Sequence, residues 1–226
     1  TYSNGAWNGT PDATTSVVIS DNLILINDLS ICSCQISNGY TLTVESDKNL
    51  IIQTTLTVDT NSNLIVKNNG SIVQSKDNYT NSGNITYIRS TTPIDKFDYT
   101  YWSTPVSPQT LYNLSPNTSG DKFYSFNETV DNWKQEDNSI TMVIGKGYII
   151  RGPQDYVSPK PLSVFDGKFK GAPNNGIITI GIGKAGNSNL LGNPYPSALD
   201  ASSFLTANSS LLEGTIYLWT HNTDIA

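Results

Sequence analysis

The chain has 226 residues, of which 37% are hydrophobic and 10% aromatic, enough for one large hydrophobic core or two smaller ones. Charged side chains make up only 14%, and 13 basic against 19 acidic residues give a net charge of −6. Because no cluster of Lys or Arg occurs, the sequence excludes the convergent cations that a nucleic-acid partner needs. Asn, Ser, Thr and Gly fill the polar positions instead, which is typical of a secreted β protein.

The N-terminal segment predicts a cap rather than a leader. Residues 1–5 lack the charged start and apolar run of a signal peptide, so a secreted precursor is expected to have been processed. Trp7 lies among the turn formers Gly5, Gly9 and Pro11 and is expected to cover the open end of the strands that follow. Apolar runs such as residues 23–26 are too short to span a bilayer, so no membrane-spanning segment is expected.

Residues 15–88 predict a ladder of very short strands. Apolar residues two positions apart, such as Leu42 with Val44 and Leu64 with Val66, recur between turns rich in Asn, Asp and Gly. Strand spacing below the roughly 8–12 residues usual in a sandwich favours a parallel β-solenoid, although an antiparallel meander would bury the same side chains. The expected strands cover residues 15–19, 23–26, 31–36, 41–44, 49–52, 55–58, 63–66, 71–73 and 84–88.

Cys32 and Cys34 are the chain's two cysteines and share one predicted strand. Residues i and i+2 of a strand have parallel Cβ vectors, which is poor geometry for a disulfide. Two buried thiols are therefore the first expectation, a strained bridge at a local bulge is the second, and a metal site is the third.

The composition changes near residues 90–93, where aromatic residues and prolines become frequent. We therefore predict a solenoid-like ladder domain at residues 1–91 and an antiparallel β-sandwich domain at residues 92–226. Within the second domain, Asn174-Asn175-Gly176 predicts a hairpin turn and Asp200 an N-cap for a short helix with Phe204 and Leu205 buried. Tyr195-Pro196 is a candidate cis peptide bond. Its expected strands cover residues 99–102, 122–126, 147–151, 164–169, 176–180 and 215–219.

Familiar catalytic patterns are missing from the sequence. His221 is the only histidine, whereas Ser or Cys hydrolases usually need a His base and zinc enzymes at least two ligands of that kind. Gly181, Gly183 and Gly186 superficially resemble a dinucleotide motif, but no helix is expected after them. The sequence therefore predicts that the protein is not an enzyme.

Acidic residues in turns leave two further possibilities. Glycosidases use carboxylate pairs, and the available groups are Asp95 with Asp98, Asp131 with Glu136 and Asp137, and Asp155 with Asp166. Caps and solvated turns explain these residues better. A calcium site is the more plausible alternative, and its candidate ligands are Asp131, Asn132, Asp137 and Asn138.

Aromatic residues are the remaining candidates for ligand binding. Trp102, Trp133, Tyr148, Tyr156 and Trp219 could include a platform that stacks on sugar rings, although filling of the core explains most of them. Trp133 is flanked by polar residues and is the best member, so Trp133 and Tyr156 are the predicted ligand-binding residues.

Several blocks carry a resemblance to a known group of proteins. The blocks at residues 98–106, 145–151, 167–176, 189–200 and 215–222, with Cys32-Ser33-Cys34 upstream, closely resemble large secreted surface proteins of flavobacteria and related Bacteroidetes. The Gly192-Asn193-Pro194-Tyr195-Pro196 block is the most specific. The resemblance implies export by type IX secretion and an adhesin-like role. Such proteins usually continue to a C-terminal sorting domain, so the second domain is expected to be incomplete at its C-terminal end.

The sequence thus leads to two functional expectations. The first is a non-enzymatic structural or adhesive module, secreted or on the cell surface, whose partner is an extracellular surface, a glycan or another protein. The second is a carbohydrate-binding or polysaccharide-degrading accessory domain. No cofactor is expected, and calcium is the one alternative.

Overall fold

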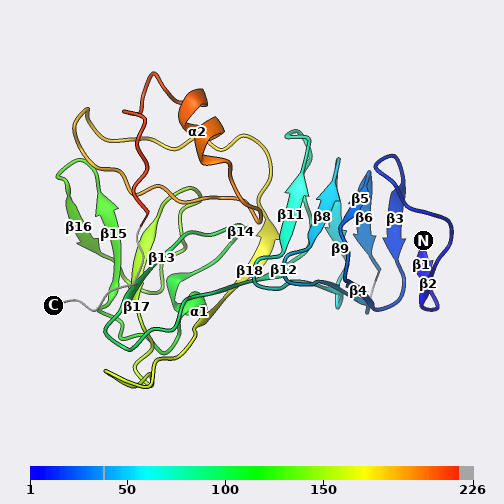
Figure 1. Ribbon diagram of the computed structural model, residues 1–226, viewed down its shortest axis with the longest axis horizontal. Coiled ribbons are helices and arrows are strands. Elements are labelled where there is room, and N and C mark those ends of the chain that lie inside the picture. Colours follow the sequence, from blue (N-terminus) through cyan, green and yellow to red (C-terminus); the bar gives the residue numbers. More distant parts are fainter. Residues whose placement is uncertain (38, 219–226) are drawn as a thin grey trace.

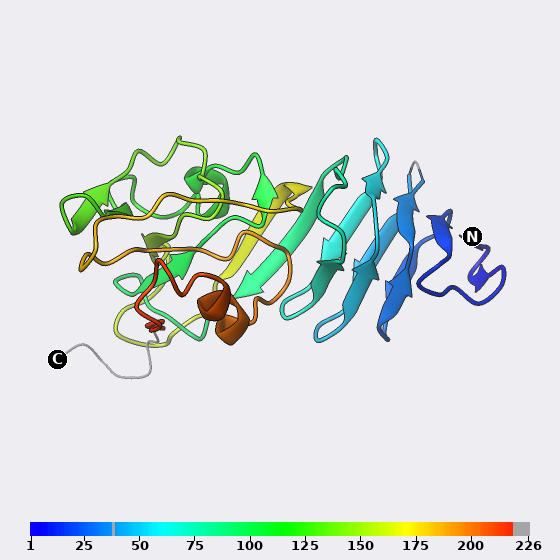
Figure 2. The same ribbon diagram turned by 90° about the horizontal axis from the view of Figure 1, so that it is seen from above.

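The computed structural model describes residues 1–37 and 39–218. Trp219 and His221, which the sequence singled out, lie outside the described residues. Within them the chain is almost entirely β-structure: a β-solenoid of about 4 turns, followed by an antiparallel sheet (Figures 1 and 2). The expected fold class is confirmed.

The solenoid has three faces, and on each face the strands of successive coils pair in parallel. The first face holds β3 (Ser16–Ile19), β6 (Ser33–Ile36) and β9 (Leu56–Val58). The second holds β4 (Leu23–Leu25), β7 (Thr41–Val44), β10 (Asn63–Val66) and β12 (Ile85–Ser90). The third holds β5 (Leu29–Ile31), β8 (Asn49–Ile52) and β11 (Ser71–Gln74).

Alternation along each strand explains why the sequence forms this solenoid. Leu42 and Val44 are fully buried, and Leu42 lies opposite Leu64, which lies opposite Ile85 in the next coil. Stacking of identical positions in this way builds a continuous apolar interior. At the corners, Asp47, Asn61 and Asn69 have positive φ values of 60°, 65° and 63°. Asn and Asp tolerate this left-handed conformation better than other non-glycine residues, so the predicted turn chemistry is confirmed.

The N-terminal hairpin caps the first coil, as predicted. Strands β1 (Tyr2–Ser3) and β2 (Ala6–Trp7) pair antiparallel, and β1 adds in parallel to β3. The rings of Tyr2 and Trp7 meet edge to face at 5.1 Å and pack against the core.

At the other end the solenoid merges with the rest of the chain. β12 pairs antiparallel with β18 (Asp166–Pro173), which also pairs with β14 (Val106–Ser107). The resulting six-stranded sheet runs in the order β14-β18-β12-β10-β7-β4. This sheet therefore contains strands from both sides of the domain boundary predicted at residue 91.

A four-stranded antiparallel sheet follows, with the strands in the order β13 (Tyr99–Trp102), β17 (Tyr148–Arg151), β15 (Phe123–Asn127) and β16 (Asn132–Gln135). Buried Phe123, Tyr148 and Ile150 on one of its faces join the same core as Phe169 of β18. Helix α1 (Leu111–Leu114) contributes Leu111 and Leu114 to that core.

Two predicted strands do not form among the described residues. Residues 176–180 make no strand, so the Asn174-Asn175-Gly176 turn does not close a hairpin. The reason is that β18, which precedes the turn, already has β12 on one edge and β14 on the other. Residues 215–218 also form no strand, and Tyr217 and Leu218 are 91% and 87% exposed.

Local predictions near the C-terminal end had mixed outcomes. Helix α2 (Ala201–Ala207) begins as expected, with the Asp200 carboxylate accepting a 2.6 Å hydrogen bond from the Ser203 N–H. Phe204 and Leu205 are half-buried, not buried, because α2 lies on the surface (Figure 2). The cis prediction for Tyr195-Pro196 was wrong: the cis bonds precede Pro108, Pro159 and Pro161. No described helix is long and apolar enough to cross a membrane.

The cysteines are both free thiols, as first expected, but only Cys34 is buried. They do not share one strand, because Cys32 occupies the corner between β5 and β6 and is only half-buried. Cys34 points into the solenoid, where burial raises the pKa of its thiol to about 12. Among the described residues, no three His, Cys, Asp or Glu side chains are placed to share a metal ion.

Candidate functional site

The four predicted calcium ligands are distributed over the two ends of β16. Asp131 is in the turn before this strand with a φ of 53°, and its carboxylate accepts a hydrogen bond from the Ser188 N–H. Asn132 begins the strand, and Asp137 and Asn138 follow its far end. An extended strand rises about 3.4 Å per residue, so the structure does not bring these oxygens together. Calcium binding stays an untested prediction.

The carboxylates of Asp95 and Asp137, two of the acidic candidates, accept hydrogen bonds within turns. Asp95 accepts from the backbone N–H groups of Phe97 and Asp98 and from the Ser158 hydroxyl. Burial opposes ionisation of Asp95, but these hydrogen bonds outweigh it and lower the pKa of the carboxyl. The Asp137 carboxylate accepts from the hydroxyl and N–H of Ser139, which lower its pKa. Groups with lowered pKa values stay ionised at neutral pH and are poor proton donors.

Trp133 and Tyr156, the two predicted ligand-binding residues, are not brought together. Trp133 is 41% exposed and meets the rings of Phe126 and Tyr101 at 5.3 and 6.3 Å. Tyr156 is half-buried, donates its hydroxyl to the Val164 carbonyl and packs against Phe165. Phe165 in turn packs against Trp102, which faces the interior beside Phe169. Tyr156 therefore belongs to the packing behind the four-stranded sheet, and Trp133 to its outer surface.

The strand register identifies the side chains that lie beside Trp133 on the same face of the four-stranded sheet. Phe126 lies opposite Trp133, and the row next to them runs from Tyr101 through Ile149 to Tyr124. At the alternate positions of β15 and β17, the side chains of Phe123, Ser125, Tyr148 and Ile150 are buried. We call this outer surface the aromatic face; its aromatic members are Tyr99, Tyr101, Tyr124, Phe126 and Trp133.

The geometry of the aromatic face suits a planar or ring-shaped ligand. Contacts between its rings are edge to face, with interplanar angles of 61° for Tyr101 with Trp133 and 85° for Phe126 with Trp133. Such contacts fix the orientation of each ring. Burial raises the pKa of Tyr99 and Tyr101, so both stay neutral phenols.

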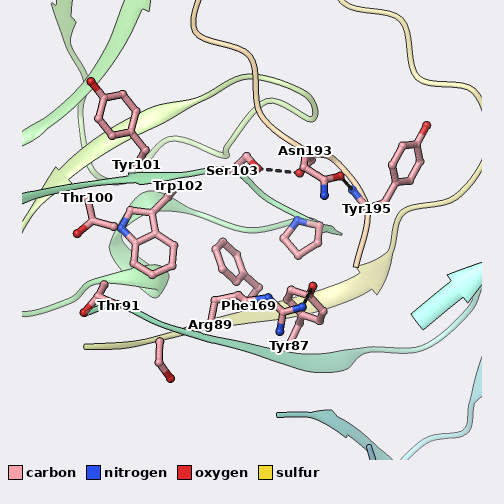
Figure 3. Close-up of a pocket in the computed structure, with 12 residues that line it drawn as sticks. Tyr87, Arg89, Thr91, Thr100, Tyr101, Trp102, Ser103, Phe169, Asn193 and Tyr195 are labelled. Carbon is pink, nitrogen blue, oxygen red and sulfur yellow. Dashed lines mark hydrogen bonds between the residues drawn. The ribbon is translucent and has the colours of Figure 1, made fainter. Parts of the chain in front are cut away.

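A pocket, which we call the junction pocket, lies where the solenoid meets the four-stranded sheet (Figure 3). It has a volume of about 310 Å³ and is lined by the end of β12, by β13 and by the loop that contains Asn193 and Tyr195. Within the lining, the Ser103 hydroxyl donates a 2.7 Å hydrogen bond to the Asn193 carbonyl and so ties β13's end to this loop. Trp102 and Phe169 form an apolar wall. Small-molecule sites commonly occupy such places between packed units.

Sequence reasoning missed Arg89, which lines this pocket. The available signal was scarcity, because the chain has only two arginines, Arg89 and Arg151. Phe126 and Tyr101 were also missed as partners of Trp133, because only the combined pairing of β13 with β17, β17 with β15, and β15 with β16 places them on one surface.

Comparison with known proteins adds a family. No curated protein and no solved structure matches this chain. A family model described as a domain of unknown function (DUF8693) matches residues 1–226. Since the match extends over the solenoid, the aromatic face and the junction pocket alike, the chain belongs to the DUF8693 family.

Proposed function

We propose that this chain is a non-enzymatic binding module of an extracellular surface protein, in which the solenoid is a rigid spacer and the aromatic face contacts a glycan. Secretion and a surface location rest on the sequence resemblance to flavobacterial surface proteins. The binding role rests on the aromatic face itself.

The observation that carries the proposal is the exposure of Trp133 on a strand with no other apolar residue. β16 reads Asn132-Trp133-Lys134-Gln135, and all four residues are exposed. A large aromatic side chain in such a strand contributes little to the core, yet it is held in place by Phe126 and Tyr101. Fixed aromatic rings at a polar surface are a common basis for recognition of ring-shaped ligands.

The proposal is tested by retention of the protein on immobilised polysaccharides, compared between wild type and Trp133→Ala. We expect wild type to be retained by at least one polysaccharide, and Trp133→Ala to lose about 2 kcal/mol of binding, roughly a 30-fold loss of affinity. Tyr112→Ala is the matched control, since Tyr112 is an aromatic residue that is 49% exposed on α1. Equal loss in both variants, or no retention of wild type on any glycan, would contradict the proposal.

Analysis of the same polysaccharides for released products separates binding from catalysis. We expect no products after prolonged incubation. Products that disappear in Asp131→Asn or Asp137→Asn would establish a polysaccharide-degrading activity in its place.

A further inference from the structure

The junction pocket contains the positive charge of Arg89, which has no carboxylate partner among the described residues. Ion pairs among the described residues join Lys67 to Glu45, Lys122 to Asp121 and Lys134 to Glu136, and none includes Arg89. The nearby Asp166 carboxylate accepts a hydrogen bond from Ser90 instead. Arg89 is only half-buried, but the loss of water around it lowers its pKa, although it stays charged at neutral pH.

The groups that contact Arg89 are all neutral. Its terminal nitrogens donate to the carbonyls of Lys67, Ile88 and Gly70 and to the Tyr87 hydroxyl. The guanidinium carbon lies 3.8 Å from the centroid of the Tyr87 ring. Burial raises the pKa of Tyr87 to about 12, so this phenol supplies no negative charge at neutral pH. The guanidinium is thus oriented but not neutralised.

The rest of the pocket is built for a small ring. Trp102 and Phe169 lie 5.9 Å apart as an apolar wall beside Arg89, while the side chains of Tyr101 and Tyr195 point outward (Figure 3). The hydroxyl oxygen of Thr100, which also lines the pocket, is buried and has no hydrogen-bond partner within the described residues. A volume of about 310 Å³ is at the small end of ligand pockets and suits one ring, not a chain of them.

We infer that the junction pocket binds a small ligand in which a carboxylate is attached to a six-membered ring. The carboxylate pairs with the Arg89 guanidinium through its remaining Nε–H donor, for which the structure shows no hydrogen bond within the described residues. The ring packs against Trp102 and Phe169. This site is separate from the outer surface of β16, so the inference does not rest on the proposed function.

The test uses the full wild-type chain and two pairs of probes. Glucuronate is compared with glucose, and benzoate with benzyl alcohol, by following backbone amide signals during NMR titration. We expect saturable shifts at residues 89–91, 100–103 and 193 with one or both carboxylates, and affinity weaker by about tenfold or more for the neutral partner. A response to glucuronate alone identifies a sugar acid, and a response to benzoate alone an aromatic acid.

Arg89→Gln gives a second test, provided that its amide spectrum shows a folded protein. We expect the saturable shifts to disappear in this variant. If the loss of the bonds to Lys67 and Gly70 unfolds it, the wild-type comparison decides alone. Equal affinity for charged and neutral probes, no saturable shift with either carboxylate, or retained binding in folded Arg89→Gln would overturn the inference and leave Arg89 as a cap of the solenoid.

Discussion

The backbone N–H of Ile72 donates a 2.7 Å hydrogen bond to the carbonyl of Pro196. Ile72 is in β11, the last strand on the third face of the solenoid, and no further strand of the described residues pairs with its outer edge. The loop with the Gly-Asn-Pro-Tyr-Pro block thus supplies an acceptor that the next coil would otherwise supply. Exposed strand edges promote association, and this contact and the N-terminal hairpin each cover part of one strand edge, at opposite ends of the solenoid.

The first prediction concerns how this loop is held. The Asn174 amide donates to the carbonyls of Pro194 and Thr104, so Asn174→Ala should free the loop from its anchor. We expect hydrogen exchange of the Ile72 amide to accelerate by about tenfold, the equivalent of one lost hydrogen bond. Asn175→Ala is the control, because Asn175 anchors the carbonyls of Lys76 and Tyr79 instead. Unchanged exchange at Ile72 in Asn174→Ala would show that the loop is held by other contacts.

The second prediction tests the solenoid interior. Leu50 is fully buried in β8, whereas its neighbour Ile51 points outward and is half-buried. Leu50→Ala should lower the free energy of unfolding by about 2–5 kcal/mol, because it leaves a cavity between stacked coils. Ile51→Ala should lower the free energy of unfolding much less, because this side chain is only half-buried. Urea denaturation of both variants measures the difference, and similar losses would mean that the alternation of inward and outward residues is misassigned.

The third prediction is a pH dependence caused by Cys34. Its thiol has a pKa of about 12 in the folded state against an ordinary value of 9.0, because burial disfavours the thiolate. Above pH 9 the unfolded chain therefore binds fewer protons than the folded chain, and stability falls as pH rises towards 12, by at most about 1.4 kcal/mol per pH unit. Between pH 8 and 10, Cys34→Ala should remove this contribution to the fall of the unfolding free energy with pH, whereas Cys32→Ala should keep it.

The fourth prediction follows from the same contrast between the two thiols. Cys32 is half-buried at a corner and Cys34 is buried, so a thiol reagent at pH 8 should label Cys32 first. In 6 M guanidinium, a strong denaturant, both should react at similar rates. Mass spectrometry of the labelled protein identifies the site, and faster labelling of Cys34 in the folded protein would contradict the placement of its side chain.

The solenoid could be predicted because its signals are local. Leu42 with Val44, Leu56 with Val58 and Leu64 with Val66 each specify a buried pair two positions apart, and all six are buried. The corner residues Asp47, Asn61 and Asn69 supply the turns in the same short stretches. Neither signal depends on distant parts of the chain.

The second half was harder because its pairings are non-local. β12 pairs with β18, so Ile85 lies opposite Gly171, and no pattern in the nearby sequence predicts this pairing. The apolar run at residues 176–180, after the Asn174-Asn175-Gly176 turn, predicted a strand, but both edges of the preceding strand were already occupied. Strand β16 was missed because its residues are all exposed and therefore show no alternation.

The candidate sites could likewise be predicted only where their signal is local. Trp133 could be chosen from its polar neighbours, but its companions Phe126 and Tyr101 come from β15 and β13 and depend on the register of three strand pairs. Arg89 was not singled out, because its importance lies in the missing carboxylate partner and not in its neighbours along the chain.

The most direct test of the binding role is a map of where a retained glycan touches the folded chain. We expect backbone amide signals of β13, β15 and β16 to shift on addition of an oligosaccharide from a polysaccharide that retains the protein, and those of β7 and β8 to stay unchanged. Shifts confined to the solenoid strands, with Trp133 unaffected, would contradict the claim that the aromatic face is the binding surface.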